Sequence, residues 1–243
     1  MFTLFKKEIR AFLSSLIGYI AICVFLLLGG LFLWILPTES NILENGYAGL
    51  DALFSLAPWV FLFLIPAVTM RSFADEKKAG TIEFLLTKPL TDLQIILAKY
   101  LASVTLVLFS LLPTLIYYYS IYKLGNPVGN IDSGGTWGSY IGLFFLAAAL
   151  TAIGTFASAL SDNQIVAFIL AVFLCFFSFI GFQYIGLLDL FGKTADLIIS
   201  IGINDHYMSM SRGVIDTRDV VYYLSLIGIF ILMTKTTLES RKW

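Results

Sequence analysis

The segment Ser139–Leu160 reads SYIGLFFLAAALTAIGTFASAL and contains no charged residue. A helix of about 20 such residues crosses the hydrocarbon core of a bilayer. Because the apolar residues run continuously instead of alternating, the pattern indicates a helix and not a barrel strand. Five further stretches have the same character: Leu16–Leu36, Leu53–Met70, Tyr100–Tyr122, Ile165–Leu188 and Val220–Leu238. The sequence therefore predicts an all-α membrane protein with six transmembrane helices.

Charge is distributed unevenly along the chain, since Lys235 is the only charged residue inside the six stretches. Charged residues make up 13% of the 243 residues, whereas ordinary globular proteins contain about a quarter. The connections are too short for a second folded domain. We therefore expect a single transmembrane domain over residues 1–243, without a built-in ATP-hydrolysing domain. The net charge of −1 gives no sign of a nucleic-acid partner.

The positions of Lys and Arg predict the orientation of the chain, because basic residues concentrate on the cytoplasmic side. With the N-terminus inside, eleven of them fall in cytoplasmic segments: Lys6, Lys7, Arg10, Arg71, Lys77, Lys78, Lys88, Lys99, Lys235, Arg241 and Lys242. Four fall outside: Lys123, Lys193, Arg212 and Arg218. Both termini are therefore expected in the cytoplasm.

Residues 2–13 interleave apolar side chains with the first basic ones. This pattern fits a short helix that lies on the inner membrane surface. A basic tail that only sets the orientation of the chain is the alternative.

Chemical groups for catalysis or ion coupling are scarce. His206 is the only histidine, and Cys23 and Cys175 lie within apolar stretches, so no metal-ligand spacing is present. Ion-coupled carriers need ionisable groups at membrane depth, but the six stretches contain no Asp, Glu or His. We expect a chain that is not an enzyme and binds no cofactor, and that receives any energy for transport from another subunit.

Small residues and prolines mark the spans. Small residues recur at every fourth position in one span: Ala147, Thr151, Thr155 and Ala159. Gly138 and Gly142 form a GxxxG pair. Such ridges let helices approach closely, either within one bundle or between chains. Proline is expected to kink or locally open two spans, at Pro58, Pro66 and Pro113.

The connection Arg71–Thr91 is the densest charged segment. Gly80 is expected to end a helical turn, and Thr81 to begin a short helix with Glu83 in its first turn. That helix would carry four bulky apolar side chains: Ile82, Phe84, Leu85 and Leu86. Pro89 ends it, and Thr91 with Gln94 forms a capping box for the next span. We interpret the segment as a docking surface, with a solvated loop as the alternative.

This segment resembles the hallmark of the type-two, exporter-like ABC permeases, whose pattern is roughly R-x-x-x-x-E-x-x-x-G-T-(hydrophobic)-E-x-L-L-x-x-P. In that family the segment includes a coupling helix that lies in a cleft of a separate ATPase subunit. The resemblance implies that ATP and magnesium bind in that partner. It also implies a coupling role for these residues: Arg71, Asp75, Glu76, Gly80, Thr81, Glu83, Phe84, Leu85, Leu86 and Pro89.

A second segment, HYMSMSRGVIDTRDVVYY, precedes the last span. It resembles the outer segment of the permease branch that includes gliding-motility and copper-delivery-associated members. The motif positions are held by His206, Arg212, Gly213, Asp216, Arg218 and Asp219. A polar cap for the last helix and a contact with substrate are the two interpretations of this outer motif.

The whole chain looks most like the gliding-motility-associated ABC permeases of Bacteroidota. This resemblance implies a multi-pass subunit of the bacterial inner membrane, surrounded by lipid, with a cytoplasmic ABC ATPase. It also implies a second permease-type subunit with a periplasmic region, or a second copy of the chain, and a link to gliding and protein secretion. The alternatives are an energy-independent carrier or channel and a structural membrane anchor of such an assembly. The motifs define neither the substrate nor the direction of transport.

Overall fold

The computed structural model describes residues 1–82, 90–188 and 192–240. These residues form helices and no strand, which confirms the all-α prediction. The elements in chain order are α1 (Phe2–Leu13), α2 (Leu16–Gly30), η1 (Leu31–Ile35), α3 (Ile42–Asn45), α4 (Asp51–Thr69), α5 (Arg71–Lys78), α7 (Asp92–Leu111), η2 (Leu112–Thr114), α8 (Leu115–Leu124), α9 (Ser133–Leu160), α10 (Gln164–Phe176), η3 (Phe177–Gly181), α11 (Phe182–Gly186), η4 (Gly192–Thr194), α12 (Ala195–Ile199), α13 (Ile203–Met210) and α14 (Thr217–Glu239).

Six helical segments of the described chain are long and apolar enough to span a membrane, as predicted. They are Gly18–Ile35, Asp51–Lys78, Asp92–Leu124, Ser133–Leu160, Gln164–Gly186 and Thr217–Glu239. Several begin at a polar side chain that accepts a hydrogen bond from a free backbone N–H of the first turn. These capping residues are Ser15, Thr91, Asp132, Asn163 and Asp216.

Helix α9 is the centre of the bundle. In its most apolar window 83% of residues are buried, whereas α2 and α10 have 22% and α14 has 17%. Glycines allow its close contacts, because a Cβ at Gly154 would overlap the side chain of Thr69, and one at Gly142 would overlap Met210. The small residues of α9 therefore pack against other helices of the same chain. This favours packing within one bundle over a contact between chains.

The prolines behave differently in the two spans that contain them. Pro58 and Pro66 lie inside α4, which is continuous from Asp51 to Thr69. Pro113 lies in the short 3-10 turn η2 that separates α7 from α8, so the expected local opening occurs there. The π-helical segments η1 and η3 interrupt two further spans.

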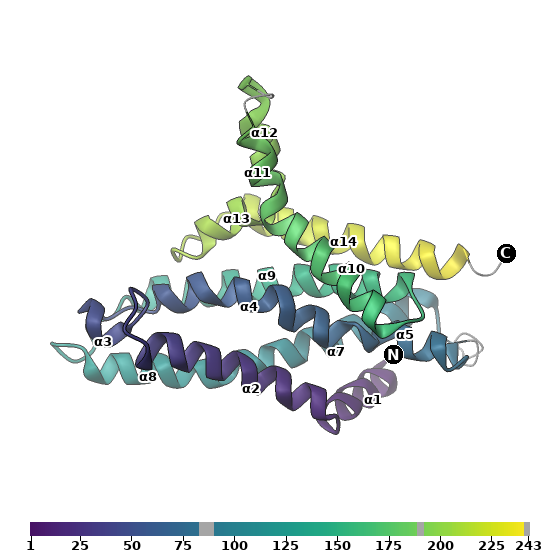
Figure 1. Ribbon diagram of the computed structural model, residues 1–243, viewed down its shortest axis with the longest axis horizontal. Helices are drawn as coiled ribbons and strands as arrows, with labels where there is room; N and C mark the ends of the chain where they lie inside the picture. The colour runs from purple at the N-terminus through teal and green to yellow at the C-terminus, as the bar shows by residue number, and fades with distance from the viewer. Residues whose placement is uncertain (83–89, 189–191, 241–243) are drawn as a thin grey trace.

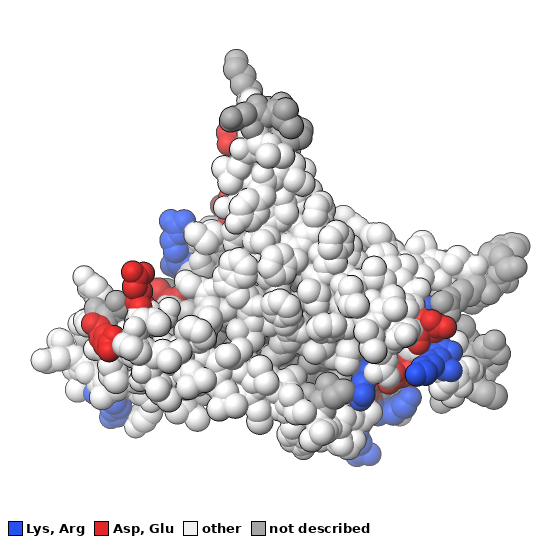
Figure 2. All heavy atoms as spheres, viewed as in Figure 1, with Lys and Arg blue, Asp and Glu red and all other residues white. Residues whose placement is uncertain are grey.

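Charged residues gather at the two ends of the long axis and are nearly absent between them on the face shown in Figure 2. One end, called the basic end below, contains α1, α5, the start of α7 and the ends of α9 and α14 (Figure 1). The opposite end contains α3, α8 and α13. Helices α11 and α12 project sideways from the bundle, from near the middle of its long axis (Figure 1).

Candidate functional site

Helix α5 carries the first half of the predicted coupling segment and is separated from α4 by a turn at Met70. It ends as the sequence predicts. Gly80 has φ +66°, a left-handed conformation that glycine adopts without a steric penalty. The N–H groups of Gly80 and Thr81 donate to the carbonyls of Lys77 and Glu76 at 3.1 and 2.9 Å. These two bonds form a Schellman motif, which fixes the direction in which the chain leaves α5.

The start of α5 is capped by a residue from another helix. The first N–H groups of a helix lack partners within it, and Met70 provides no side-chain cap. Instead, Ser158 Oγ of α9 accepts from the N–H groups of Phe73 and Ala74 at 3.0 and 3.2 Å. The same hydroxyl donates to the Met70 carbonyl at 2.9 Å. One serine therefore joins the end of α4, the start of α5 and the end of α9.

A buried ion cluster joins α5 to α1 and α7. The Lys99 side chain is 2% exposed, and its ammonium contacts Glu8 Oε1 at 3.1 Å, Glu76 Oε1 at 3.0 Å and the Ser72 carbonyl at 2.7 Å. The ammonium donates hydrogen bonds to Glu8 and to the Ser72 carbonyl, and it forms an ion pair with Glu76. Lys7, on the exposed side of α1, lies 3.5 Å from Glu76 Oε1. Glu76 is therefore held by cations from two helices.

Three further hydrogen bonds hold α5 against α9 and α10. Gln164, at the first turn of α10, accepts from Arg71 Nε at 3.4 Å and donates to Asp75 Oδ1. Lys77 Nζ donates to the carbonyl of Ala159, near the end of α9. Cations are favourable at a helix C-terminus, where carbonyls lack partners within the helix. Arg71 and Asp75 of α5 are thus both bonded to α10, whereas Glu76 contacts α1 and α7.

The rest of the predicted coupling surface is described only in part. Thr81 lies three residues after the end of α5, and its Oγ1 is 3.4 Å from the Glu76 carbonyl. The other predicted residues lie outside the described part of the chain: Glu83, Phe84, Leu85, Leu86 and Pro89. Where the description resumes, Thr91 and Gln94 form the predicted capping box at the start of α7.

Sequence reasoning missed four residues of this site: Glu8, Lys99, Ser158 and Gln164. Only Glu8 had a visible signal. It lies four residues from both Leu4 and Phe12, the two other buried residues of α1, so it falls on the buried face of that helix. The partners of the other three are distant in sequence.

At the opposite end, the structure brings His206 and Asp219 together. His206 Nδ1 lies 2.7 Å from Asp219 Oδ1, and Nε2 lies 2.9 Å from the Ser200 carbonyl. The imidazole stacks on the Tyr222 ring with centroids 3.8 Å apart. The pair joins α13 to the first turn of α14.

The other residues of the outer motif have packing or capping positions. Asp216 Oδ1 accepts from the Arg218 N–H at 2.9 Å and caps α14, as predicted. Gly213 has φ +83° and lies against Gly135 at the start of α9. Arg212 Nε donates to the Met208 carbonyl at 3.1 Å within its own turn, and the Arg218 side chain is exposed. These contacts place the motif where α9, α13 and α14 meet.

Nearby, Tyr207 fixes α13 against the second span. Its hydroxyl donates to the Phe54 carbonyl at 2.6 Å. Burial raises the pKa of this hydroxyl, so it remains a neutral donor.

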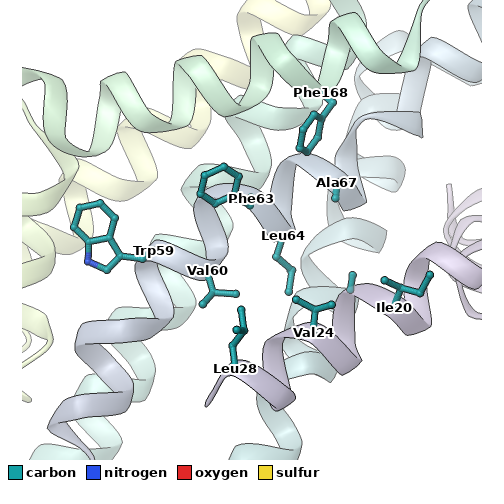
Figure 3. Close-up of a pocket in the computed structure, with 10 residues that line it drawn as sticks. Ile20, Val24, Leu28, Trp59, Val60, Phe63, Leu64, Ala67 and Phe168 are labelled. Atoms are coloured by element: carbon teal, nitrogen blue, oxygen red, sulfur yellow. The ribbon is translucent and has the colours of Figure 1, made fainter. Parts of the chain in front are cut away.

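An apolar cavity of about 510 Å³ lies between α2, α4 and α10. Figure 3 shows Val24 and Leu28 of α2 facing Val60 and Leu64 of α4, with Phe168 of α10 at one side. Its ten lining residues are all apolar except for the indole N–H of Trp59. The cavity can accept a hydrocarbon group but offers no chemistry for a reaction.

Residues 1–82, 90–188 and 192–240 contain no cluster of side chains suited to bind a metal ion. No group of three or more His, Cys, Asp or Glu side chains there could hold an ion.

In a comparison with protein families, residues 35–236 match the model of the ABC-2 family transporter protein. No curated protein matches the chain. The matched region contains α5, the outer motif and the second to sixth spans almost completely, whereas the first span lies before it except for its last residue. The chain therefore belongs to the ABC-2 family and is a non-catalytic membrane permease component of a transporter.

Proposed function

We propose that the basic end faces the cytoplasm and that α5, with the segment up to Thr91, receives the ABC ATPase. ABC-2 permeases pair with such an ATPase. The observation that carries the proposal is the position of α5, which is bonded to α1, α7, α9 and α10 at once. A displacement of the segment that follows Gly80 therefore reaches four helices through side chains that are already in contact.

The proposed movement is a rotation of α5 about the turn at Met70. Ser158 holds both sides of that turn, and the Lys99 cluster holds the middle of α5. A coupling element needs two arrangements whose balance the nucleotide changes. Breaking and remaking the contacts around Glu76 would supply them and would move α4 relative to α7.

The physiological role belongs to the same proposal. We infer an ATP-driven exporter in a bacterial inner membrane, linked to gliding motility and its associated protein secretion. It would work with a second permease-type subunit that has a periplasmic region, or with a second copy of itself. Support for this role comes from the resemblance of the outer motif and of the whole chain to gliding-motility-associated permeases.

Two substitutions at one position test the coupling role. Gly80→Val places a β-branched residue at φ +66°, where such residues are strongly disfavoured. Gly80→Asn is the matched control, because Asn tolerates this conformation. No atom of the described residues lies within 4 Å of the added Cβ, so the two variants differ mainly in backbone strain.

The measurement is co-purification of the permease with its ATPase from mild detergent, followed by the rate of ATP hydrolysis in the reconstituted complex. We expect Gly80→Val to lose most of the bound ATPase or its permease-dependent activity, and Gly80→Asn to keep both. Equal behaviour of the two variants would contradict the coupling role. Substrate flux through the permease reconstituted alone would instead favour an energy-independent carrier.

A further inference from the structure

The contacts of His206 at the opposite end require a bound proton. His206 Nε2 lies 2.9 Å from the Ser200 carbonyl oxygen, and a carbonyl oxygen only accepts hydrogen bonds, so Nε2 carries a hydrogen. His206 Nδ1 lies 2.7 Å from Asp219 Oδ1, and this contact also needs a hydrogen between the two atoms. A neutral imidazole has one N–H group and cannot serve both acceptors. The pair therefore holds one proton more than a neutral imidazole beside an ionised carboxylate.

Two features of the surroundings favour the imidazole as the carrier of this proton. Asp219 lies in the first turn of α14, where the helix dipole stabilises a negative charge. The His206 ring stacks on Tyr222 with the two planes 21° apart, and the face of an aromatic ring attracts a cation. The geometry is therefore that of an imidazolium that donates one hydrogen bond to Asp219 and one to Ser200.

Asp219 depends on this proton, because the described residues offer its side chain no other hydrogen bond. The residue is 7% exposed, and its second oxygen, Oδ2, is buried without a partner in the described chain. Loss of the proton would turn the lone pair of His206 Nδ1 toward the carboxylate and leave a buried charge unpaired, which is costly. The His206 side chain is 17% exposed, so its proton can exchange with water.

Other titratable groups near α13 were compared as partners of the ring. Helix α9 and η3 pack against α13 and contain no Asp, Glu, Lys, Arg or His. The remaining neighbouring segments carry six further charged residues: Asp51, Asp196, Asp205, Arg212, Asp216 and Arg218. The phenols nearby are those of Tyr207, Tyr222 and Tyr223, and a phenol ionises only near pH 10. Within the described chain, Asp219 is the carboxylate in contact with the ring.

The pair attaches α13 to α14 beside a cavity. This cavity of about 370 Å³ lies between α4, η3, α11 and α13, and α13 contributes Asn204, Tyr207 and Met208 to its wall. A second side-chain bond between α13 and α14 runs from the Tyr223 hydroxyl to the Ile203 carbonyl and is long, at 3.4 Å. Loss of the His206 bond would therefore weaken the attachment of this wall to α14.

We propose that His206 and Asp219 form a proton-binding site that sets how firmly α13 is attached to α14. The closed joint, with the pair in contact, binds one proton more than the open joint once a free imidazole is neutral, above about pH 6.5. The stability of the closed joint therefore falls as the pH rises through this range. Below about pH 4 the free carboxylate also takes up a proton, and the advantage of the closed joint falls again.

The first test uses the wild-type chain, in which His206 is the only histidine. The protein with nitrogen-15-labelled histidine is placed in phosphatidylcholine nanodiscs, whose lipid adds no net surface charge. The ring nitrogens are followed by NMR from about pH 5 to about pH 9. We expect an imidazolium at the acidic end and a neutral ring at the alkaline end.

Hydrogen exchange of α13 is measured on the same samples and corrected for the intrinsic effect of pH on exchange. As the ring loses its proton, we expect the corrected exchange to rise by up to about tenfold per pH unit, the limit for one proton. A ring whose protonation does not change over this range would overturn the proposal. Corrected exchange that stays constant while the ring loses its proton would overturn it as well.

Asp219→Asn separates the proton from the packing of the joint. The amide of Asn can donate to Nδ1 of a neutral imidazole, so this variant can keep the bond without the additional proton. We expect the joint to stay closed and the dependence of the corrected exchange on pH to disappear. The same dependence on pH in Asp219→Asn and the wild type would contradict the assignment.

Tyr222→Phe is the matched control. It removes the hydroxyl that donates to the Ile201 carbonyl at 2.6 Å but keeps the aromatic ring beneath the imidazole and leaves Asp219 in place. We expect exchange of α13 to rise by a similar factor at every pH, with the dependence on pH unchanged. Loss of that dependence in Tyr222→Phe would show that local packing produces it, which would overturn the proton-binding site.

Discussion

The basic end and the opposite end each hold an acidic and a basic side chain in contact, but the two sites differ in what they join. Glu8 and Lys99 are 91 positions apart in sequence, and Lys99 is 2% exposed. His206 and Asp219 are 13 positions apart, and the His206 side chain is 17% exposed. The first site holds separate helices together, whereas the second stabilises one local joint. A change of position at α5 must therefore disturb the whole bundle, whereas a change at His206 need not.

The largest expected effect comes from Lys99→Met. The substitution leaves the carboxylates of Glu8 and Glu76 without their shared buried cation, and breaking a buried ion pair from one side costs about 3–5 kcal/mol. We expect a large fall in the unfolding temperature in detergent, together with loss of the contact between α1 and α7. Hydrogen exchange of α1 measures that contact.

Lys235→Met is the control for that experiment. Lys235 forms an exposed pair with Glu239 at 3.5 Å within α14, and such pairs contribute about 0.3–0.5 kcal/mol. A similar fall in the unfolding temperature of both variants would mean that the Lys99 cluster does not stabilise the contact of α1 with α5 and α7.

The next effect is expected from Ser158→Ala. The change removes one hydroxyl but leaves two N–H groups and one carbonyl without their partner, at a cost of about 1–3 kcal/mol. We expect faster hydrogen exchange at Phe73 and Ala74 than in the wild type.

Ser225→Ala serves as its comparison, because the Ser225 hydroxyl donates only to Val221 within its own helix, at 2.7 Å. If hydrogen exchange at Phe73 and Ala74 is equally slow in both serine variants, the bonds from Ser158 do not stabilise the start of α5.

The smallest effect is expected from His206→Ala. Asp219 loses its partner on Oδ1, and the stacking on Tyr222 is lost as well. Because the site is local and partly exposed, we expect a loss of about 1 kcal/mol. Exchange should rise in α13 and the first turn of α14 while α5 remains unchanged. A rise in α5 would remove the distinction between the two ends.

The sequence predicted the parts of the structure that depend on neighbouring residues. The six spans follow from continuous apolar runs, and the caps at Thr91 and Asp216 involve bonds within three positions. The Gly80 turn was predicted for the same reason. The cap on α5 was not, because Ser158 is 85 positions from Phe73 and nothing local connects them.

Other features had weak or absent signals. Glu8 could have been recognised, since it shares the buried face of α1 with Leu4 and Phe12. The π-helical segment Leu31–Ile35 contains only apolar residues like those around it, so its composition does not distinguish it. The partners of Gly142 and Gly154 depend on the arrangement of the helices, which no residue pattern within α9 specifies.

The central position of α9 has a consequence for biogenesis. This helix is the fourth of the six spans, and it provides the main contact surface for α4, α10 and α14. Helices insert first and associate afterwards, so the first three spans enter the lipid before their principal partner exists. During that interval the backbone N–H groups of Phe73 and Ala74 have no Ser158 to bond. We therefore expect the final arrangement of α5 to form only after Ser133–Leu160 has left the ribosome.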